Sequence, residues 1–183
     1  MFSLKSVAAG ATALALLATS ATAETVIRIQ SVLGNSSDEV FMLQSFADDV
    51  EGLTGGSVKI EILPAGAVVG PRDIMDAVDA GLVEGGFAWT HYWGGKHPAA
   101  NLFGAPIAGA GVGLDAMSFL AWFQYGGGKE LYDRLWDEMG VNVKGFMLQP
   151  VGPEALGWFP SKIETMDDFR KLRFRAPPGM VGA

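Results

Sequence analysis

The sequence predicts an α/β fold in which helices cover a parallel or mixed sheet. From residue 25 to residue 89, segments with a two-residue hydrophobic period alternate with segments of helical period, in the order β-α-β-α-β. Glycine, proline and capping residues separate these segments. The chain has 183 residues, of which 49% are hydrophobic and none is cysteine. It is therefore long enough to bury a core, and that core does not depend on disulfides.

The charge and composition exclude several functional classes. The formal net charge is −7 at pH 7, and the sequence contains no run of Lys or Arg. Because phosphate neutralisation supplies most of the affinity for nucleic acids, we expect no nucleic-acid partner. The absence of cysteine rules out a thiolate zinc site, and two histidines argue against a His-rich metal site.

Residues 1–23 have the pattern of a secretory signal peptide. Lys5 precedes an apolar run of 12 residues, Val7–Ala18, and Ala21-Thr22-Ala23 forms a small-x-small cleavage site. The alternative is a membrane anchor, but a bilayer needs about 20 apolar residues. We therefore expect an exported chain that begins at Glu24 and resides in the periplasm.

The first strand is predicted at Thr25–Val32, which is rich in β-branched residues. The pattern Ser36-x-x-Glu39 is typical of a capping box and predicts a helix start. Gly55 and Gly56 end this helix. Its apolar residues follow helical spacing and are expected to face the core: Leu43, Phe46, Ala47, Val50 and Leu53.

The second and third strands are predicted at Ser57–Leu63 and Val83–Trp89. Between them, Pro71 suits a first helical position and Gly81 a helix end. In sheets of this kind, ligands bind beyond the carboxyl ends of the strands. The loops at those ends are 32–35, 63–70 and 90–96.

The rest of the chain is predicted to continue with helices and strands. The Gly-rich stretch Leu102–Leu114 is expected to be irregular. Asp115 caps a helix that Gly126-Gly127-Gly128 ends, and the next helix, Lys129–Met139, stops at Gly140. Its inward residues are predicted to be Leu131, Leu135, Trp136 and Met139. The remaining predicted elements are strands at Val141–Leu148, Ala155–Phe159 and Leu172–Ala176, and a short helix capped by Thr165 and Asp168.

Catalytic motifs are not recognisable in the sequence. The run Gly126–Lys129 lacks the spacing of a phosphate-binding loop and is interpreted as a hinge between helices. His91 and His97 are the only imidazoles, and there is no Gly-x-Ser-x-Gly nucleophile motif. The sequence therefore offers no recognisable pair of nucleophile and base.

Four residues are candidates for ligand binding. Tyr92 and Trp93 lie in an aromatic and glycine-rich loop, which suits either a pocket wall or a core plug. Glu154 precedes a predicted strand. Arg175 lies on a strand before Pro-Pro-Gly, on the same face as Arg173, where its planar guanidinium could hold a carboxylate through two hydrogen bonds.

Two segments resemble a known family. Residues 152–159 read Gly-Pro-Glu-Ala-Leu-Gly-Trp-Phe, and residues 172–179 read Leu-Arg-Phe-Arg-Ala-Pro-Pro-Gly. With the aromatic run at 87–99 and the Pro-Ala-Gly-Ala-Val-Val-Gly stretch at 64–70, they resemble the periplasmic solute-binding receptors of tripartite ATP-independent (TRAP) transporters. The resemblance is greatest to the branch that binds 2-oxo acids and related carboxylates, and it covers residues 24–183.

The resemblance implies a periplasmic-binding-protein-like fold, with two α/β lobes that are joined by a hinge and close over an organic acid. Residues 24–150 would be mainly the first lobe, and residues 151–183 the hinge crossing and the start of the second. Family members are about twice as long, so we interpret the sequence as an N-terminal fragment.

The resemblance also implies roles for residues. Arg175 matches the carboxylate-binding arginine, and Tyr92 and Trp93 would wall the pocket. Glu154 stands where relatives often carry a glutamine that contacts the ligand and a cation, so the cation could be Na⁺ or Ca²⁺. The other cation ligands would lie beyond residue 183. The expected partners are a small carboxylate and the membrane permease subunits, and a homodimer is left open.

Two other functional classes remain as alternatives. A secreted α/β hydrolase or lyase would turn over its substrate. A structural or adhesion domain would show no saturable binding of small molecules, so ligand-dependent melting would separate it from a receptor.

Overall fold

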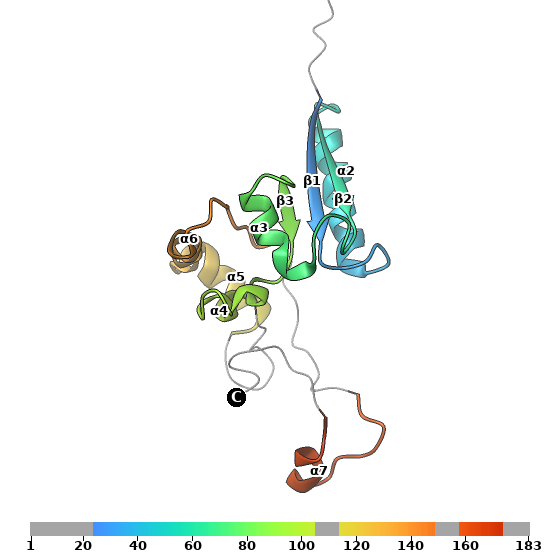
Figure 1. Cartoon of the computed structure of the whole chain (residues 1–183), viewed down its shortest axis with the longest axis vertical. Coiled ribbons are helices and arrows are strands. Elements are labelled where there is room, and N and C mark those ends of the chain that lie inside the picture. Colours follow the sequence, from blue (N-terminus) through green and yellow to red (C-terminus); the bar gives the residue numbers. More distant parts are fainter. Residues whose placement is uncertain (1–23, 105–113, 149–157, 174–183) are drawn as a thin grey trace, which may run out of the picture.

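A computed structural model describes residues 24–104, 114–148 and 158–173. Within these residues, the sheet is parallel and has the strand order β2-β1-β3 (Figure 1). It is formed by β1 (Thr25–Ser31), β2 (Val58–Leu63) and β3 (Gly85–Phe87). Thr25 lies opposite Val58 and Ile29 lies opposite Gly85. The predicted α/β fold with a parallel sheet is confirmed.

The third strand is shorter than the predicted range Val83–Trp89. Glu84 binds a side chain of β1 before the strand begins, and the chain turns away into a 3₁₀ helix at Thr90. Within the strand, Gly86 allows close packing of the helix that precedes it, because a Cβ at this position would collide with Ile74.

The first crossover helix is α2 (Asp38–Leu53), and it begins one residue later than predicted. Its N-cap is Ser37, whose hydroxyl accepts a hydrogen bond from the Val40 amide. The predicted capping box at Ser36 is therefore wrong. The shift has a physical cause: Ser37 has the extended backbone of an N-cap residue, which points its hydroxyl at the first free amides of the helix.

The inward face of α2 is narrower than predicted. Val40, Leu43 and Ala47 are buried, whereas Phe46 is 46% exposed and Leu53 is 89% exposed. Leu53 belongs to the last turn, just before the chain leaves the helix at Thr54. Two glycines with positive φ, Gly55 and Gly56, then turn the chain into β2.

The second crossover consists of the 3₁₀ helix η3 (Pro71–Asp73) and α3 (Ile74–Asp79), with Pro71 in the first turn as predicted. It brings the chain to the opposite side of β1 from β2. The strand order therefore reverses at β1, and such a reversal forms the crevice in which open α/β sheets bind ligands.

A helical layer follows β3, with the 3₁₀ helix η4 (Thr90–Trp93), α4 (Ala100–Gly104), α5 (Ala116–Tyr125) and α6 (Gly128–Met139). The prediction that Leu102–Leu114 is irregular is wrong at its start, because Leu102 to Gly104 complete α4; residues 105–113 lie outside the described part. The capping of α5 by Asp115 is confirmed by its bond to the Ser118 amide.

A cluster of large side chains holds this layer together. Its fully packed members come from η4 and from all the helices of the layer, together with α3: Met75, Trp93, Ala100, Phe123, Tyr132, Leu135 and Trp136. Leu131 is 49% exposed and Tyr132 is buried, so the inward face of α6 is rotated from the predicted one. The ring of Tyr132 lies 5.6 Å from Phe123 and 5.0 Å from Trp136.

The predicted strand Val141–Leu148 is wrong. The segment alternates between half-buried and exposed residues, as a strand would, but it forms no ladder with the described strands. Instead it packs on α6, where Val141, Val143 and Met147 contact the helical cluster. Gly145 permits this close approach, because a Cβ there would collide with Tyr132.

The last described element is α7 (Met166–Arg170), with the predicted capping box between Thr165 and Asp168. The two other predicted strands lie largely outside the described residues. Trp158, Phe159, Leu172 and Arg173, which are described, are not in a strand.

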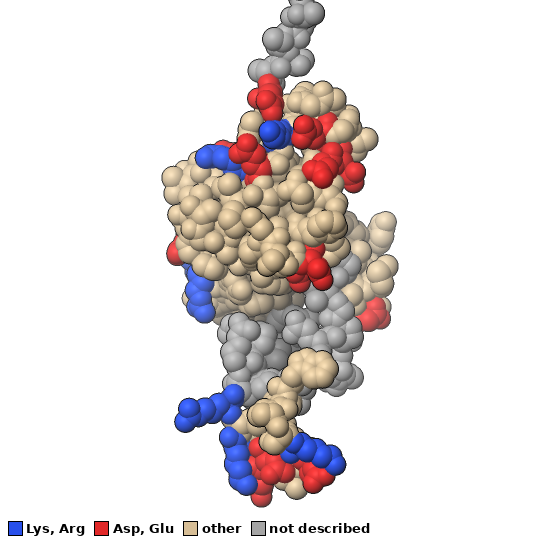
Figure 2. Space-filling model, turned by 90° about the vertical axis from the view of Figure 1, so that its right-hand side faces the viewer, with Lys and Arg blue, Asp and Glu red and all other residues tan. Residues whose placement is uncertain are grey.

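No helix of the described residues is both long and apolar enough to cross a bilayer. Figure 2 looks at the molecule from the side of α2. On this face, charged side chains gather toward the two ends, and the middle is largely uncharged.

Candidate functional site

The carboxyl edge of the sheet is held together by a buried glutamine. Gln30, near the end of β1, is fully buried. Its amide group donates to the Val69 carbonyl at 2.7 Å, and its oxygen accepts from the Val68 and Val69 amides at 3.0 and 3.1 Å. The loop that follows β2 is thereby fixed to β1, which sets the position of η3 after it.

Trp93 fixes η3 from the other side. Its indole nitrogen donates a hydrogen bond of 2.9 Å to the carbonyl oxygen of Arg72. Trp93 is 7% exposed and its ring packs edge-on against Trp136, 5.9 Å away. It therefore connects the helical cluster to the backbone of η3.

Tyr92 is held by its aromatic neighbours. Its ring lies 5.8 Å from Trp89 and 5.0 Å from His91, in edge-on contacts. His91 is itself buried, and its Nδ1 lies 2.5 Å from the Gly104 carbonyl oxygen, so this nitrogen carries the hydrogen. This bond uses the imidazole to attach η4 to α4.

A hollow of about 370 Å³ opens beside these residues and is lined by Gly70, Pro71, Arg72, Asp73 and Tyr92. We call it the η3 hollow. It lies after the carboxyl ends of β2 and β3, where the topology predicts a ligand. Its lining residues include an arginine, an aspartate and a tyrosine, so it can receive a polar group of a small molecule.

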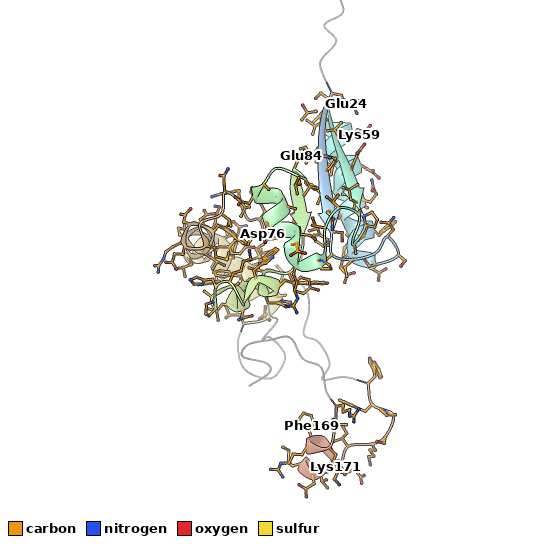
Figure 3. The ribbon with its side chains drawn as sticks, in the orientation of Figure 1. Glu24, Lys59, Asp76, Glu84, Phe169 and Lys171 are labelled. Carbon is orange, nitrogen blue, oxygen red and sulfur yellow. The ribbon has the colours of Figure 1, made fainter. Side chains whose placement is uncertain are left out.

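Two further contacts connect the elements next to the η3 hollow. Lys96 binds the carboxylate of Asp76 on α3 at 2.6 Å; Asp76 is labelled in Figure 3. Thr90 and Tyr132 share a hydrogen bond of 2.8 Å between their hydroxyls. Burial raises the pKa of Tyr132, although the bond to Thr90 opposes the shift, so its hydroxyl stays protonated at neutral pH.

Comparison with known families decides what kind of protein carries this site. The family described as bacterial extracellular solute-binding protein, family 7 (DctP), matches residues 30–182. The chain belongs to this family. The resemblance to periplasmic solute-binding receptors, stated from the sequence, is thereby confirmed.

A relative with an assigned ligand supports the same conclusion. The monocarboxylate 2-oxoacid-binding periplasmic protein of Nostoc sp. is 32% identical over 134 residues, which are 73% of this chain and 35% of the relative.

Solved structures of TRAP periplasmic solute-binding proteins share the DctP fold. A protein from Rhodobacter sphaeroides is 34% identical, with a TM-score of 0.55, over 63% of this chain and 36% of its own. A protein from Pseudoalteromonas atlantica, with bound sodium and pyruvate, is 27% identical, with a TM-score of 0.56, over 64% and 35%. One from Bordetella bronchiseptica, with calcium and picolinate, has the same identity and TM-score, over 64% and 34%.

This chain covers about a third of the length of each of these relatives. Its α/β fold corresponds to the part of the relatives that it covers.

The four predicted site residues of this DctP chain have different outcomes. Tyr92 lines the η3 hollow. Trp93 lies in the helical cluster and binds the backbone of η3, so a direct contact with ligand stays a prediction. Glu154 and Arg175 lie outside the described residues, and their roles stay predictions as well. In the described part, no three His, Asp or Glu side chains cluster closely enough to hold a metal ion.

Sequence reasoning missed Gln30, Arg72 and Asp73. Gln30 occupies an ordinary place in an alternating strand, and nothing in its neighbours signals a buried amide. Arg72 and Asp73 follow Pro71 at a predicted helix start beyond a strand end, so the topological rule for ligand edges could have found them.

Proposed function

We propose that this chain is part of a solute-binding receptor that captures a small 2-oxo or 2-hydroxy acid in the periplasm and delivers it to a TRAP permease. Membership of the solute-binding family over residues 30–182 carries this proposal. The 2-oxoacid-binding relative at 32% identity and the pyruvate-bound protein at 27% identity support the ligand class. The alternative of a secreted hydrolase has no supporting observation.

The proposed mechanism is capture without chemistry. Arg175 holds the carboxylate through two parallel, charge-assisted hydrogen bonds. Tyr92, whose ring is held in place by Trp89, forms part of the pocket wall. Trp93 connects this wall to η3 through its hydrogen bond to the Arg72 carbonyl. Closure of two lobes about a hinge then excludes water from the ligand, which strengthens each polar contact.

The domain organisation and cation are parts of the same proposal. Residues 1–23 act as the export signal, residues 24–150 form mainly the first lobe, and residues 151–183 begin the second. Glu154 is proposed as one ligand of a sodium or calcium ion. Relatives with each of these ions support the presence of a cation.

The decisive experiment compares two arginines in the natural protein that contains this sequence. Arg175→Lys keeps the charge but loses the fork, and loss of one charge-assisted bond of about 1.5–3 kcal/mol weakens binding roughly 10- to 150-fold. Arg175→Ala should weaken binding further, because the carboxylate would enter the closed site unpaired.

Arg173→Ala is the matched control, since Arg173 lies two residues earlier and is exposed. We expect little change in its Kd. Calorimetric titration with 2-oxo and 2-hydroxy acids gives the measurement. Equal and small losses for both arginines would refute Arg175 as the carboxylate anchor.

A further inference from the structure

We propose that His97 is an acid-sensitive cap at the start of α4. As a neutral imidazole, His97 accepts a hydrogen bond from the Ala99 amide and donates one to the carboxylate of Glu138. When the ring is protonated, it must release the amide, whereas its bond to Glu138 persists and becomes stronger. The start of α4 would therefore be held at neutral pH and loosened in acid.

The backbone places His97 where a helix would have its N-cap residue. The His97 carbonyl oxygen accepts from the Ala100 amide at 3.0 Å, and Pro98 follows at the first position of the turn, where proline is favoured. The Nδ1 atom of His97 lies 3.2 Å from the Ala99 amide nitrogen, two residues farther along the chain. The side-chain oxygen of a serine or aspartate cap accepts from the same position. An imidazole nitrogen can replace that oxygen only with a lone pair, so the geometry assigns an unprotonated Nδ1.

The other ring nitrogen of His97 carries the hydrogen. Its Nε2 lies 3.1 Å from the carboxylate of Glu138 on α6, and an ionised carboxylate can only accept. Glu138 is fixed in turn by Arg134, whose Nε donates to it at 2.7 Å. The hydrogen bond from Arg134 lowers the pKa of Glu138, so this carboxylate stays charged as the pH begins to fall. Both nitrogens of the neutral ring are therefore used.

Protonation removes the only acceptor of the His97 ring. An imidazolium has two N–H donors and no lone pair, so its Nδ1–H would face the N–H of Ala99. The new positive charge would also lie at the amino end of a helical turn, where the backbone dipoles disfavour it. On the other side of the ring, Glu138 favours the charge. The charged ring can therefore satisfy Glu138 but not the start of α4.

The other charges near His97 leave this balance to Glu138. Lys96 precedes His97 in the chain, but its ammonium group binds Asp76 of α3 at 2.6 Å. The residues of α4 are all uncharged. His97 is itself 29% exposed, so its ring can exchange protons with solvent.

The second histidine holds the other end of α4 and should not respond to acid. His91 donates from Nδ1 to the Gly104 carbonyl oxygen, and a protonated ring keeps that donor. Gly104 packs directly on η4, because a Cβ there would collide with the His91 amide. Acid should therefore loosen α4 from its first turn, while its last residue stays attached to the element that carries Tyr92.

The test is amide hydrogen exchange in the natural protein that contains this sequence, with His97→Asn as the reference. Asparagine is a good N-cap residue and does not titrate. At about pH 8, the upper end of the range in which imidazoles change charge, both proteins should protect the Ala99 amide. At about pH 5, the parent should lose roughly fivefold in protection relative to His97→Asn, as expected for one neutral hydrogen bond.

Two substitutions on α6 form a matched pair. Glu138→Gln should move the loss of protection to lower pH, because the ring then lacks the carboxylate that favours its charge. Asp137→Asn removes the same charge from the neighbouring exposed position and should not move it.

Nitrogen NMR of the two imidazoles gives an independent readout. At about pH 8, where imidazoles are largely neutral, we expect the hydrogen on Nε2 of His97 and on Nδ1 of His91. A hydrogen on Nδ1 of His97 would overturn the cap. Equal protection of Ala99 in the parent and in His97→Asn over the whole pH range would overturn its sensitivity to acid.

Discussion

At the scale of single residues, the carboxyl edge depends on side chains that satisfy backbone groups of another segment. Gln30 is the main example, because one buried amide completes three hydrogen bonds to the loop after β2. Buried polar groups are tolerated when every partner is in place, and they become costly when one is lost. The position of the η3 hollow therefore depends on a residue that does not line it.

Gln30→Leu should destabilise the natural protein by about 2 kcal/mol, since the replacement leaves the Val68 and Val69 backbone groups without partners. The loop is partly exposed, so water recovers some of this loss. Gln44→Leu is the control: Gln44 bonds Asp48 on the exposed face of α2 and should change stability by less than about 0.5 kcal/mol. Urea unfolding measures both variants, and equal effects would contradict the role of Gln30.

Residues that belong to a distinctive chemical pattern could be predicted from the sequence. Contacts between residues that lie far apart in the chain could not. The aromatic run around Tyr92 indicated a pocket or core, and the structure contains both, with Tyr92 at the η3 hollow and Trp93 in the helical cluster. Gln30 could not be found from composition or period, because what distinguishes it is a contact across 39 residues of the chain. Arg72 follows a predicted strand end, so the topology of the sheet, rather than its residue type, could have indicated it.

At the scale of helices and strands, local signals predicted the elements and missed details of pairing. The strands β1 and β2, the cap of α5 and the capping box of α7 follow their sequence patterns. The segment 141–148 shows why pattern alone is insufficient. Its alternating burial satisfies the sequence criterion for a strand, but a strand also needs a neighbour for its backbone, and here the segment lies on α6.

The start of α2 gives a sharp test at this scale. Ser37→Ala should cost about 1 kcal/mol, because it removes the hydroxyl that accepts from the Val40 amide. Ser36→Ala should cost almost nothing, although Ser36 is the residue that the sequence pattern favours. Chemical unfolding of the two variants compares neighbouring serines with the same substitution, and a larger loss for Ser36→Ala would restore the predicted cap.

At the scale of the whole molecule, a few contacts distant in sequence connect the sheet to the helical layer. The hydrogen bond of Trp93 to η3 joins the layer to the second crossover, and the bond between Thr90 and Tyr132 connects two helices within the layer. Lys96 adds an ion pair to Asp76 of α3. Just before β3 begins, Glu84, which is labelled in Figure 3, accepts hydrogen bonds from two side-chain nitrogens and the amide of Arg28 in β1.

This Arg28–Glu84 pair should make the stability of the molecule depend on acid pH. Hydrogen bonds from Arg28 hold the pKa of Glu84 at about 2, below its ordinary value of 4.5. A carboxylate with a lowered pKa stabilises the folded state above the unfolded pKa, and the contribution disappears as pH falls from about 4.5 toward 2. Glu84→Gln should therefore be less stable than the parent above pH 5, with a difference that shrinks as the pH falls through that window.

Because the pair is partly exposed, the effect should also weaken in high salt. Glu51→Gln controls for the loss of one negative charge, since Glu51 is exposed and has no ion pair in the described part of the chain. Urea unfolding of the three proteins between pH 2 and 7, at low and high salt, gives the measurement. The free energies of unfolding of Glu84→Gln and the parent could instead differ by the same amount from pH 5 to pH 2. That result would show that the pair does not stabilise the sheet electrostatically. If the difference for Glu84→Gln disappears in acid, and Glu51→Gln shows no such dependence on pH, the pair is an acid-sensitive connection of the sheet.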